Sequence, residues 1–145
     1  MEICRAKMED LDALVGLALK LWPGHTEADL EEDMTETMGG EDAAFFLARS
    51  GGAAVGFAQC QLRHDYVEGT DSSPVGYLEG VYVAEGFREQ GAARALLEAC
   101  ENWAKSRGCQ EFASDCELDN TQSLHFHLNV GFREANRIIC FTKQL

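Results

Sequence analysis

The sequence is short of several kinds of residue, and each shortage excludes a class of protein. Only two prolines occur in 145 residues, and no apolar run approaches the roughly 20 residues of a membrane helix. The first residues, Met1-Glu2-Ile3-Cys4-Arg5, lack the apolar core of a signal peptide. With 46% hydrophobic and 26% charged residues, we expect one globular domain over residues 1–145, cytoplasmic and not bound to a membrane.

Paired cysteine motifs are also missing. Six cysteines (4, 60, 100, 109, 116 and 140) form no Cys-x-x-Cys pair and show no regular spacing. Several lie within apolar patterns, which predicts buried thiols in a reducing compartment rather than a disulfide framework. We expect no metal site, with metal binding by these cysteines as the alternative.

Positive charge is scarce, with 12 Lys and Arg against 25 Asp and Glu and a formal net charge of −13. Between Thr26 and Asp42 there are eight acids and no Lys or Arg. Nucleic-acid binding requires basic residues that neutralise phosphates, so we expect no nucleic-acid partner. The acidic segment is either a surface that confers solubility or a field that attracts a polycation.

The hydrophobic periodicity predicts strands and helices that alternate in the order β-α-α-β-β-β-α-β-α-β(-β), a mixed α/β (α+β) layer structure. Glycines mark the turns, as in the Ser50-Gly51-Gly52 hairpin. We expect about six to seven strands in one mixed sheet and about four helices. The expected strands are 2–7, 43–49, 53–63, 77–83, 111–114 and one or two in 133–145; the expected helices are 8–21, 26–38, 91–107 and 121–129.

The segment from Glu85 to Lys105 has the features of an anion site. It follows a strand that Gly80 interrupts, which indicates a bulge or a close backbone approach. Its helix begins with the small residues Gly91, Ala92 and Ala93, which leave N–H groups and the helix dipole open to a phosphate. The pattern is neither a Walker loop nor a GxGxxG turn. An ordinary helix start with small residues is the alternative.

The motif Arg88-x-x-Gly91-x-Ala93, after a strand that ends in Val81-Tyr82-Val83, resembles the acyl-coenzyme A site of the GCN5-related N-acetyltransferases, the GNAT superfamily. Asn120, before a helix that ends in Phe126-His127-Leu128-Asn129-Val130-Gly131-Phe132, agrees with this resemblance. It covers nearly the whole chain in element order. It implies a GNAT fold with splayed central parallel strands, acetyl-CoA as co-substrate and, in many members, a homodimer.

The same resemblance implies which residues contact acetyl-CoA. Main-chain groups of the strand would hold the pantetheine arm, the loop and helix start would wrap the pyrophosphate mainly through N–H groups, and a residue before the last helix would hold the pantetheine side. These residues are Val81, Tyr82 and Val83; Glu89, Gln90, Gly91, Ala92, Ala93 and Arg94; and Asn120. His127 stands where the family usually has a tyrosine that protonates the departing thiolate. Its imidazole would be either that proton donor or a helix residue satisfied by a neighbour.

The other half of the expected site resembles the aminoglycoside 6'-N-acetyltransferases. The resemblance rests on Trp22-Pro23-Gly24-His25, on the long segment RHDYVEGTDSSPVGYLEG over residues 63–80, and on Ala113-Ser114-Asp115. It implies transfer of an acetyl group from acetyl-CoA to the 6'-amino group of kanamycin- or tobramycin-type antibiotics, and hence resistance to them.

The chemistry of a polycationic sugar suits these residues. Carboxylates on neighbouring parallel strands can pair with ammonium groups, with Glu79 as a base acting through water and Asp115 as an anchor. Trp22 and Tyr66 can stack on sugar rings and make cation–π contacts. Asn136 stands where related resistance enzymes tend to have an acid, and is a further candidate drug contact. The alternatives are a core role for Trp22, an exposed loop position for Tyr66, a turn cap for Asp115 and a solvent-facing Glu79.

Two other functions remain open from the sequence. One is an enzyme of the same fold that acetylates a polyamine or a protein N-terminus, and the other is a non-catalytic sensor that binds acyl-CoA. The apolar segment 138–142 suits strand pairing across a homodimer or an internal strand.

Overall fold

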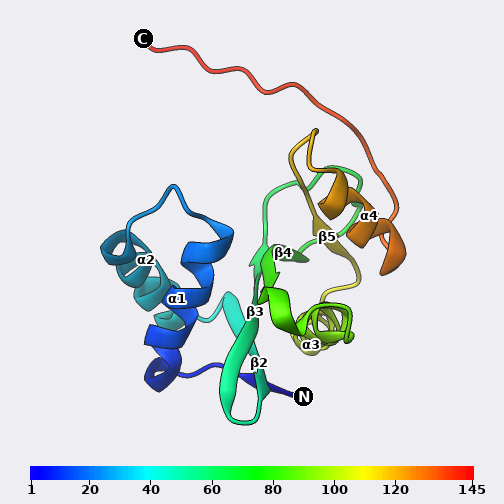
Figure 1. The fold of residues 1–145 in the computed structure, drawn as a ribbon. Helices are drawn as coiled ribbons and strands as arrows, with labels where there is room; N and C mark the ends of the chain where they lie inside the picture. The colour runs from blue at the N-terminus through cyan, green and yellow to red at the C-terminus, as the bar shows by residue number, and fades with distance from the viewer.

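The computed structural model describes all 145 residues, and its centre is one five-stranded sheet with helices on both faces (Figure 1). The strands lie in the order β1-β2-β3-β4-β5. The first four pair antiparallel, and β5 pairs parallel with β4. In chain order the elements are β1 (Glu2–Arg5), the 3₁₀ turn η1 (Met8–Asp10), α1 (Leu11–Leu21), α2 (Glu27–Gly39), β2 (Ala43–Ser50), β3 (Ala53–Arg63), β4 (Val75–Val83), the 3₁₀ turn η2 (Glu85–Phe87), α3 (Ala92–Ser106), β5 (Phe112–Ser114) and α4 (Thr121–Asn129).

Local sequence signals explain several boundaries. Gly51 and Gly52 adopt φ values of 57° and 86° between β2 and β3, as a tight hairpin turn requires. The Thr26 hydroxyl accepts a hydrogen bond from the Asp29 N–H at 3.1 Å and caps α2. Both signals confirm the predicted elements.

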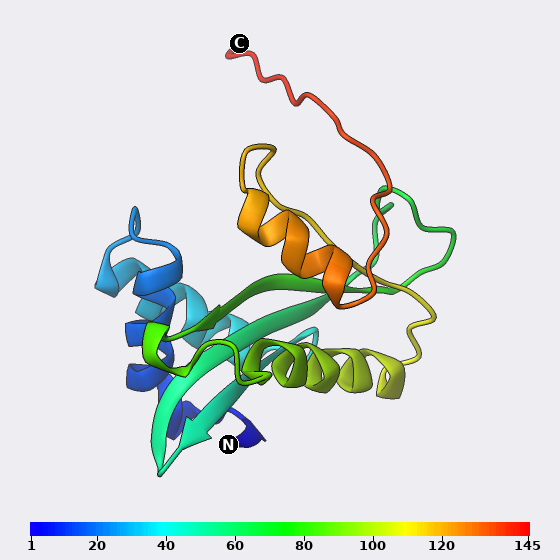
Figure 2. The same cartoon turned by 45° about the vertical axis from the view of Figure 1, so that its right-hand side comes forward.

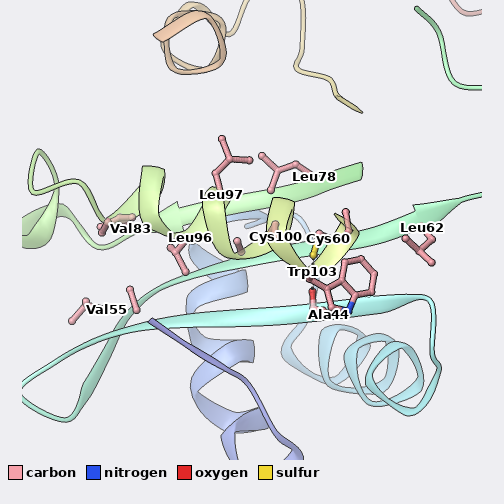
Figure 3. Packing of buried hydrophobic residues seen from close by; sticks show 14 residues of the cluster. Ala44, Val55, Cys60, Leu62, Leu78, Val83, Leu96, Leu97, Cys100 and Trp103 are labelled. Carbon is pink, nitrogen blue, oxygen red and sulfur yellow. Dashed lines mark hydrogen bonds between the residues drawn. The ribbon is translucent and has the colours of Figure 1, made fainter. Parts of the chain in front are cut away.

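The helices form two layers, with α1 and α2 on one face of the sheet and α3 and α4 on the other (Figure 1). Leu96, Leu97, Cys100 and Trp103 of α3 point at the sheet, where they meet side chains of β2, β3 and β4 (Figure 3). On the opposite face, α1 and α2 pack against a second cluster that contains Phe57. Burial of these apolar faces fixes the sheet between the layers.

Strand β4 carries an irregularity in its pairing with β3, the middle strand of the sheet. Gly80 pairs with Gln59, whereas Leu78 pairs with Cys60, so Glu79 is an extra residue with no partner of its own on β3. This arrangement is a β-bulge, which confirms the prediction from Gly80. The close approach that Gly80 also predicted occurs at the same residue. A Cβ added at Gly80 would lie 2.6 Å from Cζ2 of Trp22.

The predicted count of six to seven strands is wrong, because the sheet has five. The expected closing strands in 133–145 do not form, and this segment leads away from the body after α4 (Figure 2). Its apolar residues Ile138, Ile139 and Phe141 are 65%, 80% and 87% exposed. A strand requires a partner edge, and the parallel edge strand β5 has only three residues.

The six cysteines form no disulfide. Cys60 and Cys100 are buried, as predicted, but Cys116 and Cys140 are exposed, so the expectation of buried thiols holds for only part of the set. No helix of the structure is long and apolar enough to cross a membrane. His, Cys, Asp and Glu side chains do not gather in any group of three or more that could hold a metal ion.

Candidate active site

The two parallel strands, β4 and the edge strand β5, separate part of the way along β4. β4 pairs with β5 only from Gly76 to Leu78, opposite Phe112 to Ser114. Beyond this point β4 continues to Val83, still paired with β3 on its other edge. The edge of residues 79–83 that faces away from β3 therefore offers main-chain N–H and C=O groups to a ligand.

Two carboxylates stand where the strands separate. Glu79 is the bulged residue of β4, and Asp115 directly follows β5. Leu78 packs in the cluster beneath α3, so its neighbour Tyr77 points to the opposite face, where α1 lies. Asp115 accepts a hydrogen bond from the Tyr77 hydroxyl and thus lies on that same face. The structure brings Glu79 and Asp115 to one side of the sheet, as predicted.

Arg63, at the end of β3, binds Glu79 and stacks on Tyr77, the residue that binds Asp115. Its Nη2 lies 2.8 Å from Oε1 and 3.1 Å from Oε2 of Glu79, and its guanidinium carbon lies 3.6 Å from the centre of the Tyr77 ring. The Arg63 and Glu79 side chains are 38% and 21% exposed. The site thus holds two acids and one base, and Arg63 competes with any incoming ammonium group for Glu79.

The pKa values of two neighbours follow from this network. Burial, together with the hydrogen bond and charge of Asp115, raises the pKa of the Tyr77 phenol above its ordinary value of 10.0. Burial alone would lower the pKa of Arg63, but the hydrogen bond and charge of Glu79 outweigh it, and the net change is upward. Tyr77 therefore remains a hydrogen-bond donor and Arg63 a cation across the physiological range.

The predicted aromatic walls differ in their surroundings. Trp22 is half-buried, packs edge-on against Phe57 with ring centres 5.9 Å apart, and lies against Gly80 beside the bulge. It is therefore both a core residue and a neighbour of Glu79. Tyr66 is 75% exposed on the loop between β3 and β4, which matches its alternative as an exposed loop residue.

The loop of residues 64–74 is tied to other parts of the chain. Glu111, just before β5, accepts hydrogen bonds from the Ser72 hydroxyl and from the Asp71 N–H, and these lower the pKa of Glu111. Asn136 donates from Nδ2 to Oε1 of Glu68 at 2.8 Å. Asn136 thus contacts the loop that carries Tyr66, and its amide is not directed at Glu79.

The predicted anion loop precedes α3. The left-handed conformation recurs there, with φ of 63° at Glu89 and 81° at Gly91. Such alternation turns successive N–H groups to one side and forms an anion-binding concavity. A hollow of about 260 Å³ opens here. It is lined by Val83, Phe87, Arg88, Glu89, Gly91, Ala92, Ala93, Arg94, Phe126, Asn129 and Val130.

Two arginine side chains at this loop are already engaged. Arg88 donates from Nε to the carbonyl of Val83 at 2.7 Å, and Arg94 donates from Nη2 to the carbonyl of Asn129 at 3.0 Å. Both therefore bind main-chain oxygens, and the N–H groups at the start of α3 are the donors best placed for an anion. A larger hollow, of about 470 Å³, lies beside Glu36, Glu41 and Asp42 and includes none of these residues.

His127 lies on the face of α3 and α4, opposite the carboxylates. Its Nε2 is 2.8 Å from the Ser114 hydroxyl, and its Nδ1 is 2.7 Å from the Ser123 carbonyl. Asn120 caps α4, because its Oδ1 accepts a hydrogen bond from the Ser123 N–H at 3.1 Å. The amide NH₂ of Asn120 is left for other partners. For His127, the sequence left open either a proton donor or a helix residue whose ring is satisfied by its neighbours. The contacts of the ring in the structure match the second description.

The sequence did not identify three polar residues of the site: Arg63, Tyr77 and Ser114. Tyr77 lies two residues before Glu79 on a strand, and Ser114 adjoins Asp115, so strand alternation was a usable signal for both. No such signal existed for Arg63, because its main chain pairs with Val75 and only its long side chain reaches Glu79.

Comparison with known proteins places this fold in a class. The family model described as the acetyltransferase (GNAT) family matches residues 11–132. The chain belongs to this family, and its five-stranded sheet with four helices is a GNAT fold.

Within the family, the chain groups with the aminoglycoside 6'-N-acetyltransferases. It is 41% identical over 144 residues to the aminoglycoside N(6')-acetyltransferase type 1 of Salmonella typhimurium, covering 99% of both chains. The structure of AAC(6')-Iy in complex with the bisubstrate analog CoA-S-monomethyl-acetylneamine matches with a TM-score of 0.95, 40% identity and coverage of 99% and 98%. Apo AAC(6')-IG from Acinetobacter haemolyticus matches with a TM-score of 0.96, 37% identity and coverage of 100% and 99%.

Proposed function

We propose that this chain, as one GNAT domain over residues 1–145, transfers the acetyl group of acetyl-CoA to the 6'-amino group of aminoglycoside antibiotics of the kanamycin and tobramycin type. Such a reaction would confer resistance. The observation that carries the proposal is the position of Glu79 and Asp115, which face one side of the sheet where β4 and β5 separate. The names of the relatives and the ligand of AAC(6')-Iy support the same substrates.

The residues around the β4 edge and the α3 start fit acetyl-CoA. Main-chain groups of the segment Val81, Tyr82 and Val83 that face away from β3 would hold the pantetheine arm, except the Val83 carbonyl, which accepts from Arg88. The loop from Glu89 to Arg94 would hold the pyrophosphate through N–H groups, and the free NH₂ of Asn120 would contact the pantetheine. When bound, acetyl-CoA supplies an acetyl group as a reactive thioester.

On the opposite face, the acidic groups would bind the drug. Asp115 would anchor an ammonium group, held in place by the Tyr77 hydroxyl. Trp22 would form an apolar wall beside the bulge, and Tyr66 and Asn136 would add loop contacts at the rim. The single base Arg63 offsets one of the two negative charges, which suits a site that takes one ammonium group at a time.

The amine must lose a proton before it can attack. Glu79 would accept it through an ordered water, and the N–H of Val81 would stabilise the negative charge that develops on the thioester oxygen. His127 lies on the other side of the strand gap and is the candidate source of the proton that the leaving sulfur takes up.

The proposed reaction is tested by mass spectrometry of kanamycin after incubation with enzyme and acetyl-CoA, with NMR to locate the acetylated nitrogen. We expect one added acetyl group at N6'. Spermidine is the matched polycation without sugar rings, and thiol release with spermidine alone would refute the choice of substrate. Coenzyme A binding without thiol release on any amine would instead indicate a sensor.

We also propose that the chain is a cytoplasmic homodimer. Six unpaired cysteines suit a reducing compartment. The exposed apolar residues of segment 138–142 have no partner within the chain and suit strand pairing with a second copy. Light scattering should give about twice the 16.0 kDa mass of the chain. A chain that ends before residue 138 should give the monomer mass, and an unchanged mass would show that dimerisation does not use this segment.

A further inference from the structure

Ser114 occupies the point where β4 and β5 separate. It is the last residue of β5 that pairs with β4, opposite Leu78. Its hydroxyl lies 2.8 Å from Nε2 of His127 and 3.3 Å from the carbonyl of Leu78. The hydroxyl therefore stands between the imidazole of α4 and the gap that the proposed thioester would enter.

The contacts of His127 determine where its ring carries hydrogen. Nδ1 faces the Ser123 carbonyl at 2.7 Å, much closer than the Ser123 hydroxyl at 3.3 Å, and a carbonyl oxygen can only accept a hydrogen bond. Nδ1 must therefore be protonated in every state of the ring that keeps this contact. In the neutral ring Nε2 then has a free lone pair, and Ser114 is the donor of their hydrogen bond.

A proton on Nε2 reverses that bond. Nε2–H then donates to Ser114, and the Ser114 hydroxyl must point its own hydrogen elsewhere. The Leu78 carbonyl is its other neighbour, at a long 3.3 Å, so the hydrogen is available to a stronger acceptor in the gap. The Ser114 hydroxyl can thus receive a proton from one side and release one to the other.

The imidazole itself cannot turn into the gap without breaking these contacts. Its ring lies between Phe126 and Phe132, with ring centres 5.6 Å and 5.1 Å away. Both ring nitrogens are engaged, by Ser123 and by Ser114. The other hydroxyl at the strand gap, that of Tyr77, is bound to Asp115 on the opposite face.

We propose that Ser114 passes to the departing thiolate the proton that His127 supplies. The inference rests on the proposed acetyl transfer. As the bond between the amine nitrogen and the acetyl carbon forms, the C–S bond breaks and its electron pair goes to sulfur. Ser114 gives its hydroxyl proton to that sulfur and takes the Nε2 proton of His127, and the ring is left neutral with hydrogen on Nδ1. The amine releases its protons on the face of Glu79, and His127 regains one proton from solvent.

Three variants test this relay. Ser114→Ala removes the hydroxyl, Ser114→Thr keeps it as a matched control, and His127→Gln removes the proton source. Single-turnover rapid-quench measurements with kanamycin should show about a 10²-fold loss of acetyl transfer in Ser114→Ala and His127→Gln. The double variant should be no slower than the singles, since the two residues act as one unit. The Ser114→Thr rate should stay within about fivefold of the wild type. The dissociation constant of CoA, measured by calorimetry, and the KM for kanamycin should change by less than about twofold.

A second readout needs no substrate. ¹⁵N NMR of the free enzyme, at a pH where the His127 imidazole is neutral, should show the tautomer with hydrogen on Nδ1, and Ser114→Ala should shift the Nε2 resonance alone. A tautomer with hydrogen on Nε2, a full single-turnover rate in Ser114→Ala, or multiplicative losses in the double variant would each overturn the relay. A wild type that acetylates no aminoglycoside would refute the proposed function instead, and the rates would then be measured with whichever amine releases thiol. If none does, no thiolate departs and the relay is refuted together with the acetyl transfer.

Discussion

The contact between Gly80 and Trp22 is open to a direct test by Gly80→Ala. The added Cβ would lie 2.6 Å from Cζ2 of Trp22, 2.9 Å from its Cη2 and 2.9 Å from Cδ2 of Leu21. All three distances are shorter than a real Cβ tolerates, so the indole must move away from the bulge. Inserting a methyl group into a packed site destabilises by about 1–3 kcal/mol. For a chain of this size we expect a fall in Tm of about 3–10 °C.

The displaced indole should also affect drug binding. If Trp22 forms a wall of the acceptor site, losing its cation–π and stacking contact weakens binding of the drug by about 2- to 10-fold in KM. Thermal unfolding measures the loss of stability. Fluorescence is recorded in a Trp103→Phe background, in which Trp22 is the remaining tryptophan. Steady-state kinetics with kanamycin then give the KM.

Two other glycines provide matched controls. Gly16→Ala meets nothing within 4 Å in the middle of α1 and should stabilise by about 0.5–1 kcal/mol. Gly76→Ala meets Ala104 and Phe112 at 2.6 Å on the α3 face, so it should destabilise without moving the emission of Trp22. A Gly80→Ala protein that melts within 1 °C of the wild type and keeps the Trp22 emission would refute the packing argument.

Three further predictions concern the polar network. Glu79→Gln leaves Arg63 without its carboxylate and should reduce kcat by about 10²- to 10⁴-fold at saturating drug, and a near-normal kcat would remove Glu79 from the proton transfer. Asp115→Asn keeps the shape but removes the charge, so initial rates should show a raised KM for the drug with little change in kcat; the reverse pattern would contradict an anchoring role. Because the pKa of Tyr77 is raised in the folded chain, its share of the stability is present below pH 10 and is lost as the pH rises above 10. Melting curves of wild type should therefore fall more steeply between pH 9 and 11 than those of Tyr77→Phe, and parallel curves would contradict the shift.

Much of this fold could be predicted from short segments of the sequence. Thr26 at a helix start, the glycine pair of the hairpin and the glycine inside β4 each specify backbone geometry locally, so the pattern alone located them. The closeness of Glu79 and Asp115 could also be predicted, because residues at the point where two neighbouring parallel strands separate lie near each other. These signals do not depend on the partner that each residue meets.

What could not be foreseen depends on distant partners. Arg63 reaches Glu79 only because β3 and β4 are in a bulged register, and Tyr77 reaches Asp115 only because β4 and β5 pair from Gly76 onward. Segment 133–145 has the composition of a strand, but composition does not provide an edge to pair with.

The division of the polar groups between the two faces of the sheet has a consequence for how resistance evolves. The groups proposed to recognise the drug lie on the face of α1 and on the 64–74 loop, whereas Ser114, His127 and the α3 start lie on the other face. Substitutions on the first face can alter the spectrum of antibiotics while the acetyl-donor half stays intact. If the proposed sites hold, substitutions that escape an inhibitor confined to the drug face should leave the acetyl-donor half intact, whereas escape from one that spans the strand gap should also reduce acetyl transfer.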